Sequence, residues 1–330
     1  MGVSFFRIFR VIFFGLLALV AALFIFTFLM TASITAQHPP QGSFVQLGGG
    51  RIHLVDLMPT ANLVNGAPRG TILLLHGASG NQADVMQALG APLAAAGFRV
   101  IAPDRPGHGW SDRFEGPEQA SPARQAVIVR AALEKIGVTQ AIVVGHSLAG
   151  AMASNFAIEH KDFTQGLALI SAVTHPWPGG IAAYYHLAST PYVGWFFTHT
   201  ATLPVGLLTM PSAIKEVFAP QVPPANFIEA TGVKMVLRPD EFRANAEDVD
   251  ALYDFIVVQS KRMHEITAPT GIIAGDKDSV VFTTIHSVNT EREVAGATLK
   301  ILPDMGHAPH HSATAEVVEM ILQVAKRSGL

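Results

Sequence analysis

Ser147 has the local surroundings that a nucleophilic serine needs. The segment Val143–Gly150 reads VVGHSLAG, so an apolar run leads directly into a stretch suited to a helix. A serine at such a strand-to-helix turn projects clear of a sheet, where a neighbouring base can remove its hydroxyl proton. The turn crowds strand against helix, and the small residues Gly145 and Ala149 leave room for it. Taken alone, the same serine would also suit a helix cap.

An acid and a base for this serine occur further along the chain. Asp276 and Asp278 follow the apolar run 270–274, and His307 follows the run 298–302. A serine, a histidine and an aspartate in hydrogen-bond contact make a nucleophile, a general base and a group that orients the base. From the residues alone, either aspartate could serve.

His310 and His311 lie close behind His307 and raise the question of a metal site. Imidazoles are common ligands of zinc, but the loop that holds these two offers no other evident ligand. We therefore expect them to brace the loop, and we predict no metal site.

Further motifs along the chain accompany these candidate catalytic residues. The apolar run 71–75 is followed by His76, Gly77 and Ala78, and residues 104–111 read DRPGHGWS. With GHSLAG, the Gly275 turn and the Gly306-His307 pair, five motifs resemble those of the α/β-hydrolase family. Ala149 departs from the G-x-S-x-G pattern at its last glycine, a sterically mild change.

The resemblance implies a role for each residue. Ser147 is the nucleophile, His307 is the base, and Asp278, three residues after Gly275, is the acid. The backbone N–H groups of Ala78 and Leu148 form the oxyanion hole. Asp276 is then a turn residue, and Asp104 and His108 brace their loop. Serine at the turn argues against the related dehalogenases and epoxide hydrolases, which use aspartate there.

The surrounding elements fit this family. Short apolar runs alternate with helical patterns, which predicts an α/β fold, a mostly parallel, doubly wound sheet. We expect residues 37–174 and 267–330 to form this α/β-hydrolase core. The predicted strands are 44–47, 52–57, 71–75, 99–102, 141–144, 166–170, 270–274 and 298–302, and the predicted helices are 84–96, 121–136, 148–160 and 313–326.

A long insertion interrupts the alternation. About a hundred residues separate the strands near Ile170 and Thr270, far more than an ordinary connection needs. We predict that residues 175–266 form a mainly helical cap. No charged residue occurs from Phe163 to Ile214, and aromatic residues are frequent there. This composition favours an apolar substrate, although core packing alone would account for most of the aromatics.

The apolar N-terminal sequence predicts a transmembrane helix. Val11 to Met30 is uncharged and apolar, and about 20 such residues cross a bilayer. Arg7 and Arg10 precede it, which places the N-terminus in the cytoplasm and the catalytic domain on the extracytoplasmic side, the periplasm in a bacterium. We expect residues 1–36 to be an uncleaved single-pass anchor. The alternative is a signal peptide, whose apolar region is usually shorter.

Composition narrows the function further. The net charge of −3 gives no reason to expect nucleic acid, and the absence of cysteine excludes thiolate chemistry. We predict hydrolysis of a small apolar carboxylic ester through an acyl-enzyme, with no cofactor and no deducible protein partner. Lactone hydrolysis, carbon–carbon bond hydrolysis and a catalytically silent ligand-binding homologue remain alternatives. Perhydrolase or haloperoxidase activity would be a side reaction of the same triad.

Overall fold

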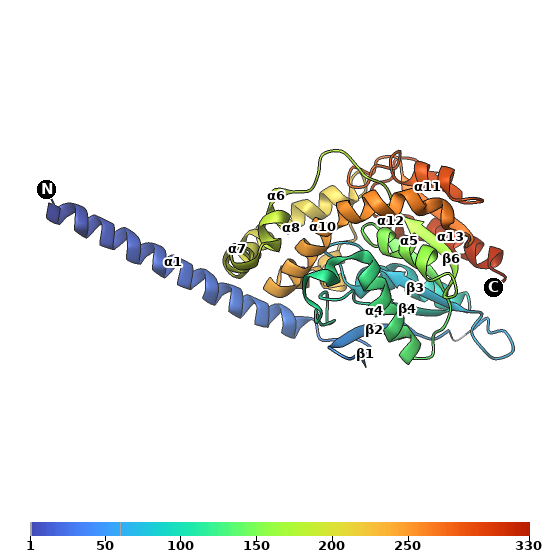
Figure 1. The fold of residues 1–330 in the computed structure, drawn as a ribbon. Helices are drawn as coiled ribbons and strands as arrows, with labels where there is room; N and C mark the ends of the chain where they lie inside the picture. Colours follow the sequence, from blue (N-terminus) through green and yellow to red (C-terminus); the bar gives the residue numbers. More distant parts are fainter. Residues whose placement is uncertain (1, 60) are drawn as a thin grey trace.

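An eight-stranded sheet forms the centre of the computed structural model, which describes residues 2–59 and 61–330 (Figure 1). The strand order is β1-β2-β4-β3-β5-β6-β7-β8. The strands are β1 (Ser43–Gln46), β2 (Arg51–Leu57), β3 (Thr71–Leu75), β4 (Arg99–Pro103), β5 (Ala141–His146), β6 (Thr164–Ile170), β7 (Thr270–Gly275) and β8 (Thr298–Leu302). All eight predicted strands are present, with small differences at their ends.

The sheet is mostly parallel, as predicted. β1 and β2 form the expected antiparallel hairpin at one edge, and β2 also pairs antiparallel with β4. The pairs from β4 through β3, β5, β6 and β7 to β8 are all parallel. Parallel strands place all their carboxyl ends at one edge, where the loops that carry a site can meet.

Helices cover both faces of the sheet, because successive strand side chains point to opposite sides. Leu73, Val143 and Leu167 lie in a core with α4 (Pro122–Lys135) and α5 (Ala149–Glu159). Their neighbours Ile72, Ile142 and Ala168 lie in a second core. Its helices are α2 (Gln82–Val85), η1 (Met86–Gly90), α3 (Ala91–Ala95) and α13 (Thr314–Arg327). The single helix predicted over 84–96 is thus divided by a π-helical turn, η1.

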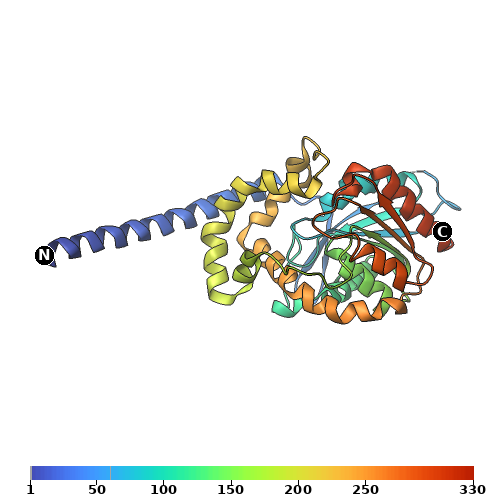
Figure 2. The same ribbon diagram turned by 90° about the horizontal axis from the view of Figure 1, so that it is seen from above.

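The long stretch between β6 and β7 is mainly helical, as predicted. Figure 2 shows most of its helices at one end of the molecule, while its last long helix, in orange, runs back along the body. They are α6 (Ala183–Ser189), α7 (Pro191–Phe197), η3 (Thr198–Thr202), α8 (Leu203–Phe218), α9 (Phe227–Thr231), η4 (Val233–Leu237), α10 (Pro239–Gln259) and η5 (Ser260–Glu265). We refer to this stretch as the cap.

A buried ion pair joins the cap to the core. Arg105, in the loop after β4, is fully buried and donates hydrogen bonds to Asp248 of α10 and to Gln125 of α4. Arg113 reaches the other carboxylate oxygen of Asp248 at 2.8 Å. A buried guanidinium without such partners would be very costly, so this contact holds α10 in one position over the sheet.

The N-terminal helix α1 (Gly2–Gln37) projects from the body of the molecule on the side of the cap (Figure 1). Within Phe5–Gln37, an 18-residue stretch has a mean hydropathy of 2.8, and the segment is long and apolar enough to cross a membrane. A signal sequence near the N-terminus can meet the same criteria of length and hydropathy. Two further helices complete the fold near the C-terminus, α11 (Ser287–Glu293) and α12 (Pro309–Ser312).

Candidate active site

Ser147 occupies a strained turn between β5 and α5. Its φ is +54°, a left-handed backbone conformation that residues other than glycine rarely adopt. Gly145 makes the turn possible, because a Cβ there would lie 2.6 Å from the carbonyl oxygen of Ala149. The prediction that position 145 must be small therefore has a direct steric cause.

On the helix side, the closest packing falls at Gly150 and not at Ala149. A Cβ on Gly150 would lie 2.4 Å from the Cβ of Ala172, in the segment after β6. Ala149 is fully buried, and the fold accommodates its methyl group. This explains why alanine can stand at the last glycine of the motif.

The fold brings Ser147, His307 and Asp278 into one hydrogen-bonded chain. The Nε2 atom of His307 lies 2.9 Å from the Oγ of Ser147, and its Nδ1 lies 2.8 Å from Oδ2 of Asp278. The three side chains come from the carboxyl ends of β5, β7 and β8 and are almost completely buried. This arrangement can pass the serine proton to the imidazole and stabilise the imidazolium that results.

The two candidate aspartates lie in different surroundings. The second carboxylate oxygen of Asp278 accepts hydrogen bonds from the N–H groups of Val280 and Val281, at 2.9 and 2.8 Å. Asp276 is exposed, and its carboxylate lies 3.1 Å from the ammonium group of Lys277. Only Asp278 is in contact with His307.

The predicted oxyanion donors lie next to the serine. A Cβ on Gly77 would come within 2.9 Å of the Cβ of Ser147, so the loop that carries Ala78 packs against the turn. Leu148 directly follows the serine. Within residues 2–59 and 61–330, the structure gives neither the Ala78 nor the Leu148 N–H a hydrogen-bond acceptor. Two unpaired N–H groups beside Ser147 are available to a developing oxyanion.

A buried polar network shapes the loop before Ala78. Nε2 of His76 accepts from the N–H of Arg105, whose side chain donates to the carbonyl oxygens of His76 and Gly77. Burial, with the guanidinium of Arg105 next in importance, lowers the pKa of His76 to about 3. His76 is therefore neutral at ordinary pH and supports the loop.

The loop 104–111 supports the site in the way expected. The carboxylate of Asp104 accepts from Nδ1 of His53 and from the N–H groups of Gln82 and Trp110. Burial and Arg105 hold the pKa of His108 well below its usual range. These contacts fix the loop against its neighbours.

Sequence reasoning missed Asn245 of α10. Its side-chain oxygen accepts from the N–H of Ser79 at 2.7 Å, and its amide nitrogen lies 3.3 Å from the Ser79 hydroxyl. Ser79 has a φ of +58°, so this contact holds a second strained residue beside Ala78. The two positions are 166 residues apart, and nothing local in the sequence points to their contact.

An apolar cluster adjoins the predicted oxyanion hole. It combines Leu148 and Val173 of the core with side chains of the cap, and Ala78 packs against it. The cap members are Val249, Leu252 and Ile256, with Trp177, Ile181, Tyr185 and Phe255 packed around them. A substrate carbonyl at Ser147 would therefore have apolar surface beside it.

Residues 72–320 match the sequence model of the alpha/beta hydrolase family. The chain belongs to this family. The match covers the strands and loops described above, from β3 to α13, and it confirms the resemblance seen in the sequence.

Similar proteins carry several hydrolytic activities. A 2-hydroxy-6-oxo-6-phenylhexa-2,4-dienoate hydrolase of Burkholderia cepacia is 35% identical over 124 residues, which cover 36% of this chain and 41% of that protein. The match therefore spans less than half of that relative. An sn-1-specific diacylglycerol lipase of Mus musculus, ABHD11, is 23% identical over 81% of this chain and 85% of its own length.

Among solved structures, an esterase from Exiguobacterium antarcticum superposes with a TM-score of 0.68. The superposition covers 87% of this chain and 100% of the esterase, at 19% sequence identity. At this identity the likeness supports the fold and leaves the substrate open.

The two aspartates can be separated by substitution. Asp278→Asn should keep the fold and lower kcat by about 10⁴-fold, the loss seen in another triad enzyme when an amide favours the wrong imidazole tautomer. Asp276→Asn is the matched control and should change kcat little, because its exposed carboxylate lies beside Lys277 and the backbone of Asp304 and Met305, where an amide oxygen can still accept hydrogen bonds. Steady-state kinetics on one ester measures kcat for both variants. A larger loss of kcat in Asp276→Asn than in Asp278→Asn would identify Asp276 as the acid.

Proposed function

We propose that this chain is a serine esterase that cleaves apolar carboxylic esters through an acyl-enzyme. The observation that carries the proposal is the hydrogen-bonded chain from Ser147 through His307 to Asp278. It joins a nucleophile, a base and an acid beside two unpaired backbone N–H groups. Each component has the type and position that acyl transfer requires.

The mechanism follows from this geometry. His307 accepts the hydroxyl proton as Ser147 attacks the ester carbonyl carbon, and Asp278 stabilises the imidazolium. The N–H groups of Ala78 and Leu148 donate to the oxyanion, each contributing about 3–4 kcal/mol in comparable hydrolases. The imidazolium then protonates the leaving alcohol, which departs and leaves the acyl-enzyme. Water, deprotonated by His307, attacks the acyl group and releases the carboxylic acid and the free serine. These steps use no cofactor.

The apolar cluster beside Leu148 supports an apolar acyl group. Its cap members come from α10, from α6 and from the segment before α6, so apolar side chains of the cap pack beside Leu148. The esterase and lipase activities of similar proteins agree with an ester substrate. Lactones and the carbon–carbon bonds of ring-cleavage products use the same triad, and a panel of these three classes distinguishes them.

Ser147→Ala tests whether the chain is an enzyme or a silent binding protein. The variant should fold normally and lose on the order of 10⁶-fold in kcat, because removal of the nucleophile disables the whole triad. A fluorophosphonate probe should label the wild type at Ser147 and leave the variant unlabelled. Failure to label the folded wild type would favour the silent binding protein.

Acyl chain length tests the apolar wall. Across acetate, butanoate and hexanoate esters of one alcohol, kcat/KM should rise, since each buried methylene contributes about 0.8 kcal/mol, or about fourfold. Ala251→Ser, a substitution on α10 outside the apolar cluster, serves as a control and should show the same slope. A preference for acetate over hexanoate would mean that the cap aromatics serve only as core.

We also propose that α1 is an uncleaved membrane anchor. Ile34 is buried in a cluster with Leu203, Met235 and Leu237 of the cap. The carbonyl of His38, just beyond α1, accepts from the indole N–H of Trp110 at 3.0 Å. Cleavage after residue 36 would strip Ile34 from this cluster and expose its apolar surface. Arg7 and Arg10 favour a cytoplasmic N-terminus and an extracytoplasmic catalytic domain.

An anchor in this position would bring part of the cap into the lipid. Phe24 packs against Trp195 and Phe196 of α7, with ring centroids 5.7 and 5.8 Å apart. If the hydrocarbon begins at Val11, Phe24 lies about 20 Å into a layer about 30 Å thick. Trp195 and Phe196 then lie about 10 Å below the outer edge of the hydrocarbon, a depth that apolar helix faces reach in membrane interfaces.

The surface around this contact suits lipid. Tyr192 and Leu208 are 91% and 83% exposed, and Val193 and Val205 are also exposed. Both views of the fold show α7 and α8 on the side from which α1 projects (Figures 1 and 2). An uncharged apolar face next to an anchor gives an ester dissolved in the outer leaflet a short path to the cap.

Fluorescence quenching tests the position of the cap. The chain has three tryptophans, so Trp110→Phe with Trp177→Phe leaves Trp195 as the only reporter. In vesicles of brominated phosphatidylcholine, this full-length variant should be quenched strongly. Trp110→Phe with Trp195→Phe leaves Trp177 beside Tyr253 of α10 and should be quenched little. Equal quenching of the two would contradict an immersed cap.

A further inference from the structure

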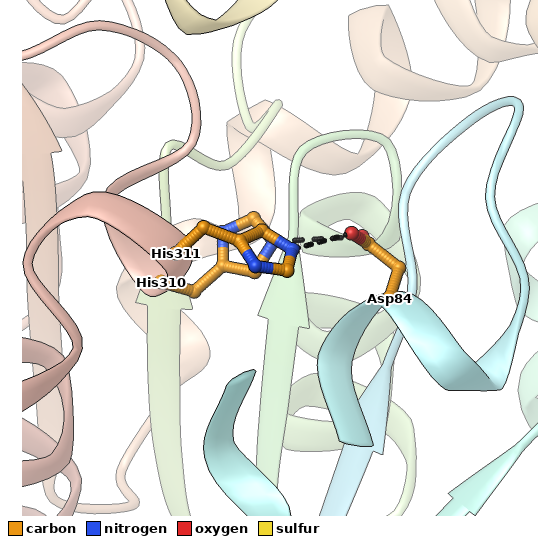
Figure 3. A group of neighbouring side chains, drawn as sticks. All are labelled: Asp84, His310 and His311. Carbon is orange, nitrogen blue, oxygen red and sulfur yellow. Dashed lines mark hydrogen bonds and ion pairs between the residues drawn. The ribbon is translucent and has the colours of Figure 1, made fainter. Parts of the chain in front are cut away.

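Three side chains outside the proposed triad converge behind it. Asp84 projects from α2, and His310 and His311 project from the short helix α12 (Figure 3). Nε2 of His311 lies 2.8 Å from one carboxylate oxygen of Asp84, and Nε2 of His310 lies 3.4 Å from the other. All three ligand atoms lie within 4.8 Å of one another. The sequence showed only the two histidines, and the fold supplies the carboxylate.

A fourth nitrogen faces the same carboxylate. Nδ1 of His146 lies 4.0 Å from Oδ2 of Asp84, and the imidazole rings of His146 and His310 are 4.2 Å apart. His146 directly precedes Ser147, so this histidine comes from the end of β5. Three imidazoles from two separate segments therefore surround one largely buried carboxylate, 15% exposed.

The hydrogen bonds of the cluster are incomplete. Nδ1 and Nε2 of His310 and Nδ1 of His146 are buried, and none makes a hydrogen bond among residues 2–59 and 61–330. Nε2 of His310 and Nδ1 of His146 have only the longer approaches of 3.4 and 4.0 Å to Asp84. A buried polar atom without a partner costs about 1–3 kcal/mol, so three such atoms in one cluster call for an explanation. A bound cation would satisfy the nitrogens that face the carboxylate.

The tautomer of His146 also supports a bound cation. Its Nε2 lies 3.2 Å from the carbonyl oxygen of His307, and a carbonyl oxygen can only accept. Nε2 therefore carries the proton, and in the neutral ring Nδ1 directs a lone pair toward a carboxylate that is also only an acceptor. A histidine that ligates a metal through one nitrogen while donating from the other to a backbone carbonyl has this arrangement.

We propose that Asp84, His146, His310 and His311 bind one Zn²⁺ ion. Three imidazole nitrogens and one carboxylate oxygen are a donor set that zinc prefers. Ligands at about 2.0–2.1 Å in a tetrahedron lie about 3.3 Å from each other. His311 and His310 approach different carboxylate oxygens of Asp84, at 2.8 and 3.4 Å, and Nδ1 of His146 lies 4.0 Å from the second oxygen. The three ligands Asp84, His310 and His311 already lie within 4.8 Å of one another, and His146 would have to move closer to complete the tetrahedron.

Four protein ligands leave no open position, so the ion would be structural. It would connect α2, the residue before Ser147 and the helix that follows His307. Zinc would thereby position the nucleophile and the base relative to each other without contacting substrate. The proposal does not depend on the ester hydrolysis proposed above, because the ligands are separate from the triad.

Metal binding by the full-length protein in detergent tests the proposal. Tag-free protein is stripped with dipicolinate, reloaded with Zn²⁺ and analysed by elemental mass spectrometry and by a competing chromophoric chelator. The wild type should hold one Zn²⁺ per chain, and its Tm should rise on reloading. X-ray absorption at the zinc edge should show three nitrogen ligands and one oxygen ligand from the protein.

Matched variants assign the ligands. His311→Gln and Asp84→Asn should each lose the bound zinc and the rise in Tm, whereas His264→Gln, an exposed histidine of η5, should retain both. If a ligand variant fails to fold, the absorption spectrum of the wild type still decides. A wild type that takes up no stoichiometric zinc, shows a Tm independent of zinc or gives a different ligand set would overturn the proposal. The cluster would then be an ion pair between Asp84 and its histidines.

Discussion

The left-handed turn at Ser147 is the constraint on which the rest of the site depends. A non-glycine residue in this conformation costs about 1–2 kcal/mol, and the surrounding packing must hold it there. Three glycines allow that packing: Gly145 beside the first turn of α5, Gly150 against Ala172, and Gly77 against the serine itself. The same close approach brings the loop of Ala78 to the serine. The close packing around this one turn thus positions both the nucleophile and the proposed oxyanion donors.

Local patterns predicted much of this structure. Apolar runs marked all eight strands. In the central strands β3, β5, β6 and β7 the cause is that a buried parallel strand needs apolar side chains on both faces. Ser147 and His307 could be chosen from short motifs, since a sharp turn and a strand end leave traces within a few residues. Asp278 required the family spacing, because two aspartates two residues apart are equivalent in composition and differ only in what the folded loop places beside them.

Contacts between segments distant in the chain could not be predicted from the sequence. Asn245 supports Ser79 from a cap helix, and Asp84 meets His311 across 227 positions, so no periodicity or spacing could relate them. The π-helical turn at Met86–Gly90 was also missed, because its residues, MQALG, are equally compatible with an α-helix. Gly150 was overlooked for a similar reason: its need for a small residue comes from Ala172, in the segment after β6.

The junction between α1 and the body of the protein contains no hinge. Ile34 is buried one turn before the helix ends, and Trp110 holds the backbone just after it. With α1 inserted in a bilayer, the attached domain would lose its rotational freedom about any axis in the membrane plane. Every copy would present the same face to the lipid. The search for a lipid-dissolved substrate would then take place in two dimensions, and its rate would follow the mole fraction of substrate in the leaflet and not its bulk concentration.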